Sequence, residues 1–324
     1  MKILLVIGGS GFFGKSILDA FSRNLLAPWN ISKVIVMSRS ADKLLQDTPS
    51  LVGSNVELYS ADITNTKCLP FADYVIHAAA STDVRNYLSS PEDEKKNIQA
   101  GTYHYCDLAK IHHSNSKIVY VSSGAIYGVQ PPDLDEIDES FVGDLAKMAP
   151  GKLDYAVAKQ DAERAISDLG QAGLNVSIAR CFAFVGKYLP RDQHFAIGNF
   201  IDDVINKRQI TVKANYQVYR SYMYADDLVE WLMTIADNSS TNCPIYNVGS
   251  DQAVLVGDLA KILANTYHVQ LEIPLIADSK IDRYIPSIKK AKKELGLLLK
   301  YSLTESITGT IRESAKKDWL ISKK

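Results

Sequence analysis

Short apolar runs recur through the first 180 residues, and amphipathic stretches separate them. The runs are ILLVIG (3–8), KVIVMS (33–38), VELYSAD (56–62), YVIHAAA (74–80), KIVYVSS (117–123) and NVSIARCF (175–182). Nearly unbroken apolar strands that alternate with helices are typical of a parallel sheet covered by helices on both faces. The pattern therefore predicts an α/β fold with a doubly wound parallel sheet.

Helical periodicity and stop signals mark two helices between these strands, at residues 14–26 before Pro28 and at residues 155–171 before Gly173. After about residue 183 the rhythm changes. We expect a helix at 196–207, a short strand pair of ITVKA (210–214) and YRSYMY (219–224), a helix at 226–237 and a strand in IYNVGS (245–250). This order indicates a first domain at 1–185 and a smaller portion at 186–324, with parts of about 220–250 returning to the first sheet.

Composition points to a small-molecule partner. The 324 residues include 36 basic and 37 acidic side chains, so no polybasic surface suggests nucleic-acid binding. No apolar run approaches the roughly 20 residues that a membrane span needs, and we expect a soluble cytoplasmic protein. The four cysteines are widely separated and the histidines show no HExxH-type spacing, so buried reduced thiols are expected and no metal site is.

A glycine-rich turn follows the first strand. GGSGFFG (8–14) places Gly8, Gly11 and Gly14 in a GxxGxxG pattern, with Phe12 and Phe13 between the last two glycines. Such glycines permit a tight turn and close backbone approach, and the next helix directs its positive N-terminus at a pyrophosphate. A tight turn without a ligand is the alternative. Because the motif lies in the first strand-turn-helix of a parallel fold, we predict dinucleotide binding.

The end of the second predicted strand bears on which dinucleotide binds. An NAD site places Asp or Glu there to accept hydrogen bonds from the adenosine ribose, whereas this chain offers Ser38, Arg39 and Ser40. A guanidinium flanked by hydroxyls matches a 2′-phosphate, so NADP(H) is favoured over NAD(H). Alternatively, Arg39 is a solvated surface charge or stacks on adenine with either cofactor. Asp62, before Ile63 in SADIT (60–64), could hold the adenine amino group or cap a helix.

Tyr155 and Lys159 in YAVAK (155–159) lie four residues apart, on one face of the predicted helix. A nearby ammonium stabilises a phenolate, so the pair is expected to lower the tyrosine pKa and support proton transfer at physiological pH. By itself such a pair is common by chance, because a Tyr and a Lys on a partly exposed helix usually serve packing and solvation. SSGAIYG (122–128) strengthens it, because it follows a strand whose carboxyl end opens on the expected ligand crevice.

Together these segments resemble the extended short-chain dehydrogenase/reductases, specifically the nucleotide-sugar epimerase/dehydratase group. The matching segments are GGSGFFG, SADIT, VIHAAA, VYVSSGAIYG, YAVAK, NVSIARCF, RSYMYADDLVEWL (220–232), YNVGS (246–250) and RYIPSIKKAKKELG (283–296). The resemblance implies a Rossmann-type domain, a smaller C-terminal substrate-binding domain, a nicotinamide cofactor, a nucleoside-diphosphate sugar in the cleft, and a homodimer.

The resemblance also implies roles for individual residues. Ser123, Tyr155 and Lys159 look like the catalytic trio; Ala78, Ala79 and Ala80 would line the cofactor; Asn199 and Arg220 resemble the residues at the sugar diphosphate, with Arg283 as a second clamp. Two positions depart from the family pattern. Asn97 in NIQAGT is displaced by one residue, about 100° of helix, and Ala183 stands where the family often has asparagine.

The absence of an acidic residue beside Ser123 narrows the set of possible reactions. Dehydratases and decarboxylases of this group place an acid beside the catalytic Ser or Thr, but Gly124, Ala125 and Ile126 follow Ser123. The remaining reactions are reduction of a 4-keto-6-deoxy sugar, which Arg39 favours, and 4-epimerisation. A non-catalytic NADP-binding sensor or assembly protein is a third hypothesis, which the intact trio disfavours. The histidines are interpreted as core or surface residues. His194 is the one that we would substitute to test for a role, because it lies near the expected sugar site.

Overall fold

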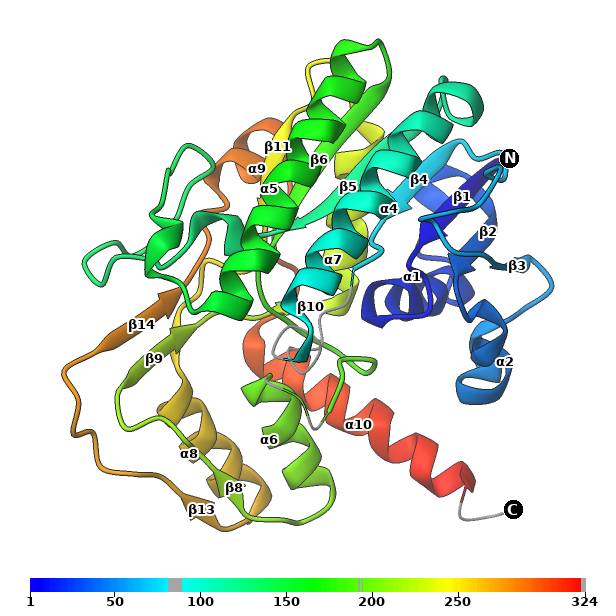
Figure 1. The fold of residues 1–324 in the computed structure, drawn as a ribbon. Coiled ribbons are helices and arrows are strands. Elements are labelled where there is room, and N and C mark those ends of the chain that lie inside the picture. The colour runs from blue at the N-terminus through cyan, green and yellow to red at the C-terminus, as the bar shows by residue number, and fades with distance from the viewer. Residues whose placement is uncertain (81–88, 192, 194, 322–324) are drawn as a thin grey trace.

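A seven-stranded parallel sheet forms the centre of the protein, in a computed structural model that describes residues 1–80, 89–191, 193 and 195–321 (Figure 1). The strand order is β11-β6-β5-β4-β1-β2-β3, with every neighbouring pair parallel. The strands are β1 Lys2–Ile7, β2 Ile31–Ser38, β3 Val56–Ser60, β4 Tyr74–His77, β5 Lys117–Ser123, β6 Asn175–Cys181 and β11 Ile245–Val248. The predicted doubly wound α/β fold is therefore confirmed.

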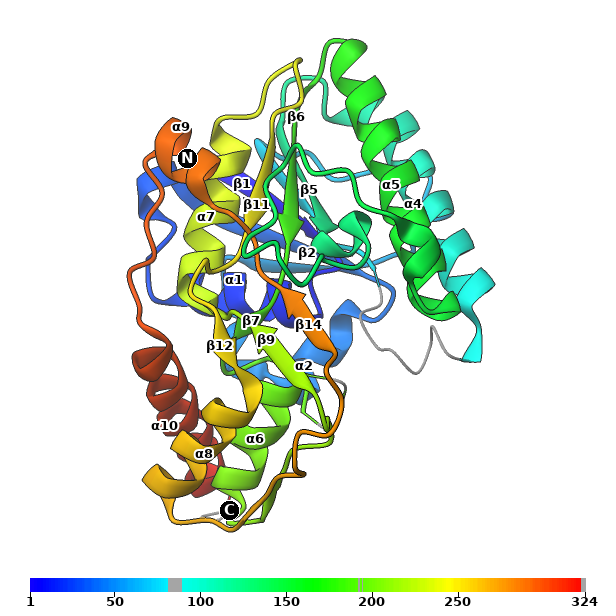
Figure 2. The same cartoon turned by 90° about the vertical axis from the view of Figure 1, so that its left-hand side faces the viewer.

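Alternate residues of each strand face opposite layers, as a pleated strand requires. Leu4 and Val6 pack toward α1 and α7, whereas Leu5 and Ile7 pack toward α4 and α5. Figure 2 shows these two helix layers on the two faces of the sheet. The α-helices of the described residues are α1 Phe12–Ser22, α2 Leu44–Asp47, α4 Pro91–His112, α5 Pro150–Gln171, α6 Ala196–Ile205, α7 Ala225–Asp237, α8 Val256–Tyr267, α9 Lys289–Leu295 and α10 Leu303–Ile321.

The helix that bears Tyr155 begins five residues earlier than expected, at Pro150. Proline suits the first turn of a helix, because the backbone N–H groups there have no acceptor within the helix. A proline, which lacks this group, therefore loses no hydrogen bond. Within the Tyr155–Lys159 segment of this helix, Ala156, Ala158 and Lys159 are buried.

A further hydrophobic cluster, separate from the two on the faces of the sheet, lies beyond the carboxyl ends of the strands and is built by α6, α8 and the start of α10 (Figure 2). Three small sheets accompany it, formed by β7 Phe184–Val185, β8 Ile210–Thr211, β9 Gln217–Arg220, β10 Met223–Tyr224, β12 Val254–Leu255, β13 Leu271–Glu272 and β14 Ile281–Tyr284. The predicted pairing of ITVKA with YRSYMY is wrong. β8 pairs with β13, β9 pairs with β12 and β14, and β10 pairs with β7. The partners come from distant segments whose pairing local sequence does not specify.

No helix in the described part of the chain combines the length and apolar content that crossing a membrane requires. The four cysteines are free, and Cys68 is exposed rather than buried.

Candidate active site

The glycine turn lies between β1 and α1, where the strand order reverses between β1 and β4. Gly8 has a φ of +85°, and a Cβ on it would lie 2.7 Å from the backbone of Ala78. A Cβ on Gly14 would lie 2.0 Å from the Gly9 carbonyl oxygen. The fold itself therefore requires glycine at both positions, because any side chain would collide with backbone.

Gly11 is different, because among the described residues a Cβ there would meet only the Gly8 oxygen, at an ordinary 3.6 Å. Packing within the protein does not explain glycine at this position, whereas close approach of a ligand does. Gly11 also precedes α1, whose first turn has no capping side chain and no acidic residue. The backbone N–H groups of this first turn, which have no partner within the helix, and the positive helix end fit the pyrophosphate of a dinucleotide.

The aromatic side chains of the turn pack inside the protein. The rings of Phe12 and Phe13 pack on Phe184, with centroids 6.2 and 5.5 Å from its ring. Contacts from this pair to a cofactor would therefore come from backbone N–H groups. The Ala78–Ala80 segment follows β4 and lies against Gly8, so the structure brings these predicted cofactor residues together.

Ser38, Arg39 and Ser40 lie at the carboxyl end of β2, as predicted. The Ser38 hydroxyl is buried without a hydrogen-bond partner among the described residues. The Arg39 side chain is exposed, and its positive charge lowers the pKa of Glu94 at the start of α4, although burial raises that pKa overall. Arg39 can therefore reach a ligand phosphate but shares its surroundings with a carboxylate.

Asp62 forms a turn after β3, where its carboxylate accepts hydrogen bonds from the backbone N–H and hydroxyl of Thr64, both at 2.9 Å. Asp62 therefore has the capping role that was the alternative to binding the adenine amino group, although it caps a turn and not a helix. Both hydrogen bonds go to the same carboxylate oxygen. Ile63 is buried. Its methyl group lies 3.1 Å from where a Cβ on Gly101 would be, so Ile63 also packs against α4.

The predicted trio comes together at the carboxyl end of β5. Ser123 ends the strand, and its hydroxyl accepts a hydrogen bond from the Ala125 N–H at 3.2 Å. Tyr155 on α5 is a hydrogen-bonding partner of the Ser123 side chain. One turn further along α5, the buried Lys159 ammonium donates to the Val121 carbonyl at 2.8 Å and to the Tyr120 hydroxyl at 3.1 Å. An ammonium has three N–H groups, so these two bonds leave a third for Tyr155 or a cofactor hydroxyl.

The electrostatic effect on Tyr155 differs from the prediction. Burial raises the pKa of Tyr155, and the Lys159 charge and the Ser123 hydrogen bond lower it by less, so the net shift is upward. Burial likewise lowers the pKa of Lys159. The expectation of a lowered tyrosine pKa is therefore wrong for the protein alone, because desolvation outweighs the neighbouring ammonium.

His77 lies at the end of β4, buried between the rings of Tyr105 and Tyr120. Neither ring nitrogen has a hydrogen-bond partner among the described residues, so His77 is a core histidine but not a satisfied one. Burial, and then the Lys159 charge, lower the pKa of His77 to about 3.

This shift predicts a loss of stability in acid. An unfolded histidine binds a proton below about pH 6.5, whereas folded His77 remains neutral down to about pH 3. Unfolding is therefore favoured as pH falls through this window. Urea unfolding of wild type and His77→Phe should diverge by about 1.4 kcal/mol per pH unit below pH 6 in favour of the variant. Parallel stability curves of the two proteins would contradict the prediction. The comparison isolates His77, because other groups with shifted pKa values, such as Asp227, are present in both proteins.

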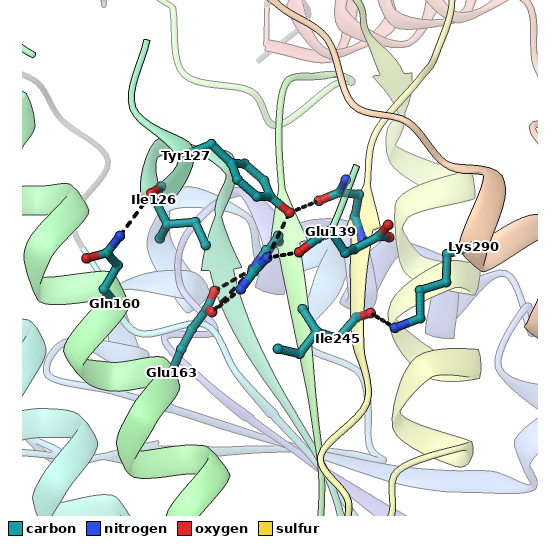
Figure 3. Close-up of polar contacts among 9 residues, drawn as sticks. Ile126, Tyr127, Glu139, Gln160, Glu163, Ile245 and Lys290 are labelled. Carbon is teal, nitrogen blue, oxygen red and sulfur yellow. Dashed lines mark hydrogen bonds and ion pairs between the residues drawn. The ribbon is translucent and has the colours of Figure 1, made fainter. Parts of the chain in front are cut away.

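A buried ion pair that the sequence analysis missed supports the Ser123 turn. Arg180 on β6 forms a bidentate pair with Glu163 on α5, with a shortest distance of 2.8 Å and side-chain exposures of 12% and 9%. The same guanidinium donates to the Tyr127 hydroxyl at 2.9 Å, and that hydroxyl donates to Asn247 on β11 at 2.8 Å. Figure 3 shows Glu163 and Tyr127 pointing toward this shared centre from α5 and from the 3-10 turn after Ser123. The available signal was that Glu163 is one turn beyond Lys159 on α5.

Tyr284 is a second missed residue. It comes from β14, and its ring packs on Phe182 with centroids 4.6 Å apart. Burial raises the pKa of Tyr284, and the nearby Ser123 hydroxyl lowers it by less. A Cβ on Gly124 would lie 2.7 Å from both the Tyr284 hydroxyl and the tip of the Phe182 ring. No local signal in the sequence connects position 284 with position 123.

The predicted substrate arginines are engaged within the protein. Arg220 on β9 forms a bidentate ion pair with Asp282, at 3.0 and 3.1 Å, and donates to the Tyr219 carbonyl at 2.8 Å. Arg283 donates to the Pro132 carbonyl at 3.0 Å and lies over the Tyr219 ring. Diphosphate binding by Arg220 would have to compete with Asp282.

The other predicted substrate positions vary. Asn199 on α6 donates to the Gln193 carbonyl at 2.7 Å, while its own side-chain oxygen is buried without a partner among the described residues, which fits a polar ligand. Ala183 bonds only through its backbone, whose carbonyl accepts from the Met223 N–H. Asn97 is exposed on α4. His194 lies outside the described residues.

Comparisons with known proteins agree with this fold. UDP-glucuronic acid decarboxylase 1 of Xenopus tropicalis is 25% identical over 314 residues, covering 96% of this chain and 71% of the relative. The crystal structure of UDP-glucose 4-epimerase of Thermotoga maritima with UDP-glucose superimposes with a TM-score of 0.77 at 20% identity, covering 98% and 99% of the two chains. DesIV, a dTDP-glucose 4,6-dehydratase of Streptomyces venezuelae solved with NAD bound, gives 0.78 at 20% identity and 98% coverage of both.

The model of the NAD dependent epimerase/dehydratase family matches residues 4–249, which include the glycine turn, Ser123, Tyr155, Lys159 and Arg220. Since this match covers well over half of the chain, the protein belongs to the NAD-dependent epimerase/dehydratase family of nucleotide-sugar enzymes.

Proposed function

We propose that the protein is an NADP-dependent oxidoreductase that acts at C4 of a nucleoside-diphosphate sugar, as a 4-keto-6-deoxy-sugar reductase. The observation that supports this most is the convergence of Ser123, Tyr155 and Lys159 with no acid beside Ser123. The sugar would lie between the first domain, residues 1–185, and the smaller portion, residues 186–324. We also propose that the protein forms a homodimer and that the boundary between the two parts lies near residue 185.

Each residue of the trio has a distinct task in this reaction. The bound nicotinamide would supply the hydride to C4. Tyr155 would give its proton to the C4 oxygen, and the Ser123 hydroxyl would donate a hydrogen bond to that oxygen as negative charge develops. Lys159, held by Tyr120 and the Val121 carbonyl, would direct its remaining N–H toward the reacting side and favour proton release from Tyr155.

The surroundings of Gly124 argue against elimination of water and decarboxylation. These reactions use an additional acid or base, which the resemblance to the family places beside the catalytic serine. At position 124 the Tyr284 hydroxyl and the Phe182 ring occupy the space that such a side chain would need. The similarity to UDP-glucuronic acid decarboxylases therefore supports the family and not that reaction.

The choice of NADP(H) rests on Arg39 with its flanking hydroxyls. The exposed guanidinium and the unpartnered Ser38 hydroxyl suit a 2′-phosphate. Asp42, the nearest acid along the chain, instead accepts a hydrogen bond from Ser60 at 2.7 Å. One observation favours the second candidate, a 4-epimerase that retains NAD. Glu94 shares the surroundings of Arg39 and would repel a 2′-phosphate.

Cofactor identity tests these alternatives. Purified protein is denatured, any released nucleotide is identified, and emptied protein is titrated with NADPH and NADH. We expect no bound NAD(H), and we expect Arg39→Ala to raise the Kd for NADPH about 10- to 100-fold with little effect on NADH. Arg164→Ala, which removes an exposed arginine of α5, is the matched control. The emptied protein should then oxidise NADPH with 4-keto-6-deoxy nucleotide sugars.

Two outcomes would redirect the assignment. Stoichiometric NAD(H) in the purified protein would favour the 4-epimerase. An equal loss of NADPH and NADH binding in Arg39→Ala would mean that Arg39 stacks on adenine rather than binding a phosphate.

A further inference from the structure

Tyr284 is brought to the active site by the tertiary fold. On β14 it stands opposite Arg220 of β9, and its ring lies against Phe182. Its hydroxyl faces Ser123 and occupies the space that any side chain at position 124 would take. The glycine and the tyrosine therefore complement each other, because Gly124 leaves the room that the Tyr284 hydroxyl fills.

Hydrogen-bond accounting at Ser123 gives this contact a chemical meaning. A serine hydroxyl has two acceptor sites and one proton to donate. The Ala125 N–H already donates to the Ser123 oxygen at 3.2 Å. Burial raises the pKa of Tyr284, so its hydroxyl keeps its proton at any ordinary pH and can act as a second donor. With both acceptor sites used, the Ser123 proton has to point to another group.

We propose that Tyr284 is a positioning residue that fixes the direction of the Ser123 proton. The Tyr284 hydroxyl donates to Ser123, and Ser123 then donates to Tyr155 or to the substrate oxygen. Ser123 is thereby a dedicated donor to the oxygen that gains negative charge, rather than a hydroxyl that rotates between donor and acceptor roles. The effect on the substrate oxygen rests on the proposed function, whereas the effect on Tyr155 does not.

The test that needs no substrate measures the acidity of Tyr155. Tyrosines labelled with ¹³C at Cζ are followed by NMR through a pH titration in the complex with the oxidised cofactor that the protein binds, and Tyr155→Phe assigns the resonance. Besides Ser123, the described groups that act on Tyr155 include Lys159, Tyr120 and Cys181, which are unchanged in the variant, and Tyr284, whose ring stays in Tyr284→Phe. Tyr284→Phe should raise the pKa of Tyr155 by about 0.5 to 1 unit, because the phenolate loses an oriented donor.

Two further variants guard this measurement. Tyr246→Phe removes another buried hydroxyl, bonded to Glu294 at 3.0 Å and remote from Ser123, and should leave the Tyr155 pKa unchanged. Gly124→Ala keeps the Tyr284 phenol but displaces its hydroxyl, and should raise the Tyr155 pKa as Tyr284→Phe does. An unchanged Tyr155 pKa in both Tyr284→Phe and Gly124→Ala would overturn the proposal.

A double-mutant cycle tests the same idea in turnover. Tyr284→Phe should lower kcat about tenfold with KM changed less than threefold, and it should cost nothing further in a protein that already has Ser123→Ala. Multiplicative losses would show that Tyr284 acts independently of Ser123 and would refute the positioning role. A shifted Tyr155 pKa in a protein with no C4 activity would instead leave the positioning role standing and reject the proposed function.

Discussion

Tyr155→Phe is expected to lower kcat for C4 reduction about 1,000-fold, because general acid catalysis by a positioned side chain typically contributes 10²- to 10⁴-fold. The substitution retains the ring and removes only the hydroxyl that partners Ser123. Lys159 should stay in place, since its bonds to Tyr120 and Val121 do not involve Tyr155. Steady-state kinetics with NADPH and the sugar substrate measure the loss.

The control is again Tyr246→Phe, which should keep wild-type kcat. Cofactor titration separates catalysis from binding, and the Kd of Tyr155→Phe for NADPH should change less than about tenfold, the worth of one neutral hydrogen bond. If Tyr155→Phe turned over substrate at the wild-type rate, Tyr155 would not be the proton donor. The non-catalytic sensor hypothesis would gain weight if the biological activity also survived.

The second large effect concerns stability. Glu163→Gln should lower the free energy of unfolding by about 3 to 5 kcal/mol, because the Arg180 charge would remain buried without its partner. Although burial lowers it, the pKa of Arg180 is raised overall by the hydrogen bond and charge of Glu163, so the guanidinium cannot escape by losing its proton. Urea unfolding monitored by circular dichroism gives the difference.

A matched substitution on the surface provides the comparison. Glu57 pairs with Lys33 at 2.6 Å, but both side chains are more than 40% exposed, so Glu57→Gln should cost less than about 1 kcal/mol. Replacing both Glu163 and Arg180 by methionine should recover much of the loss, because no uncompensated charge remains. Equal effects of Glu163→Gln and Glu57→Gln would contradict the argument.

The ion pair also connects stability with the site. Arg180 holds the Tyr127 hydroxyl, and Gln160 on α5 donates to the Ile126 carbonyl at 3.0 Å, so two bonds fasten the turn after Ser123 to α5 and the sheet (Figure 3). The turn and the helix that bears Tyr155 are therefore fixed relative to each other. This rigidity is what a proton donor and a hydrogen-bond donor to the same oxygen require.

The sequence by itself determined the features that short segments encode. Strand runs such as 3–8 and 117–123 are apolar and bounded by turn residues, so their positions followed from periodicity. The glycine turn could be recognised because restrictions act within the segment itself: Gly8 has a φ of +85°, and a Cβ on Gly14 would collide with the Gly9 carbonyl oxygen. Tyr155 and Lys159 were paired by helix spacing, which also needs no distant information.

Only the tertiary structure decided how distant segments meet. Tyr284 reaches Ser123, Asp282 occupies Arg220, and Arg180 joins Glu163 to Tyr127, and each contact depends on how separate elements pack. The small sheets were mispaired for the same reason, since two-residue strands have little register information of their own. The pKa of Tyr155 also required the fold, because burial is a property of the packed molecule and here it outweighs the local lysine.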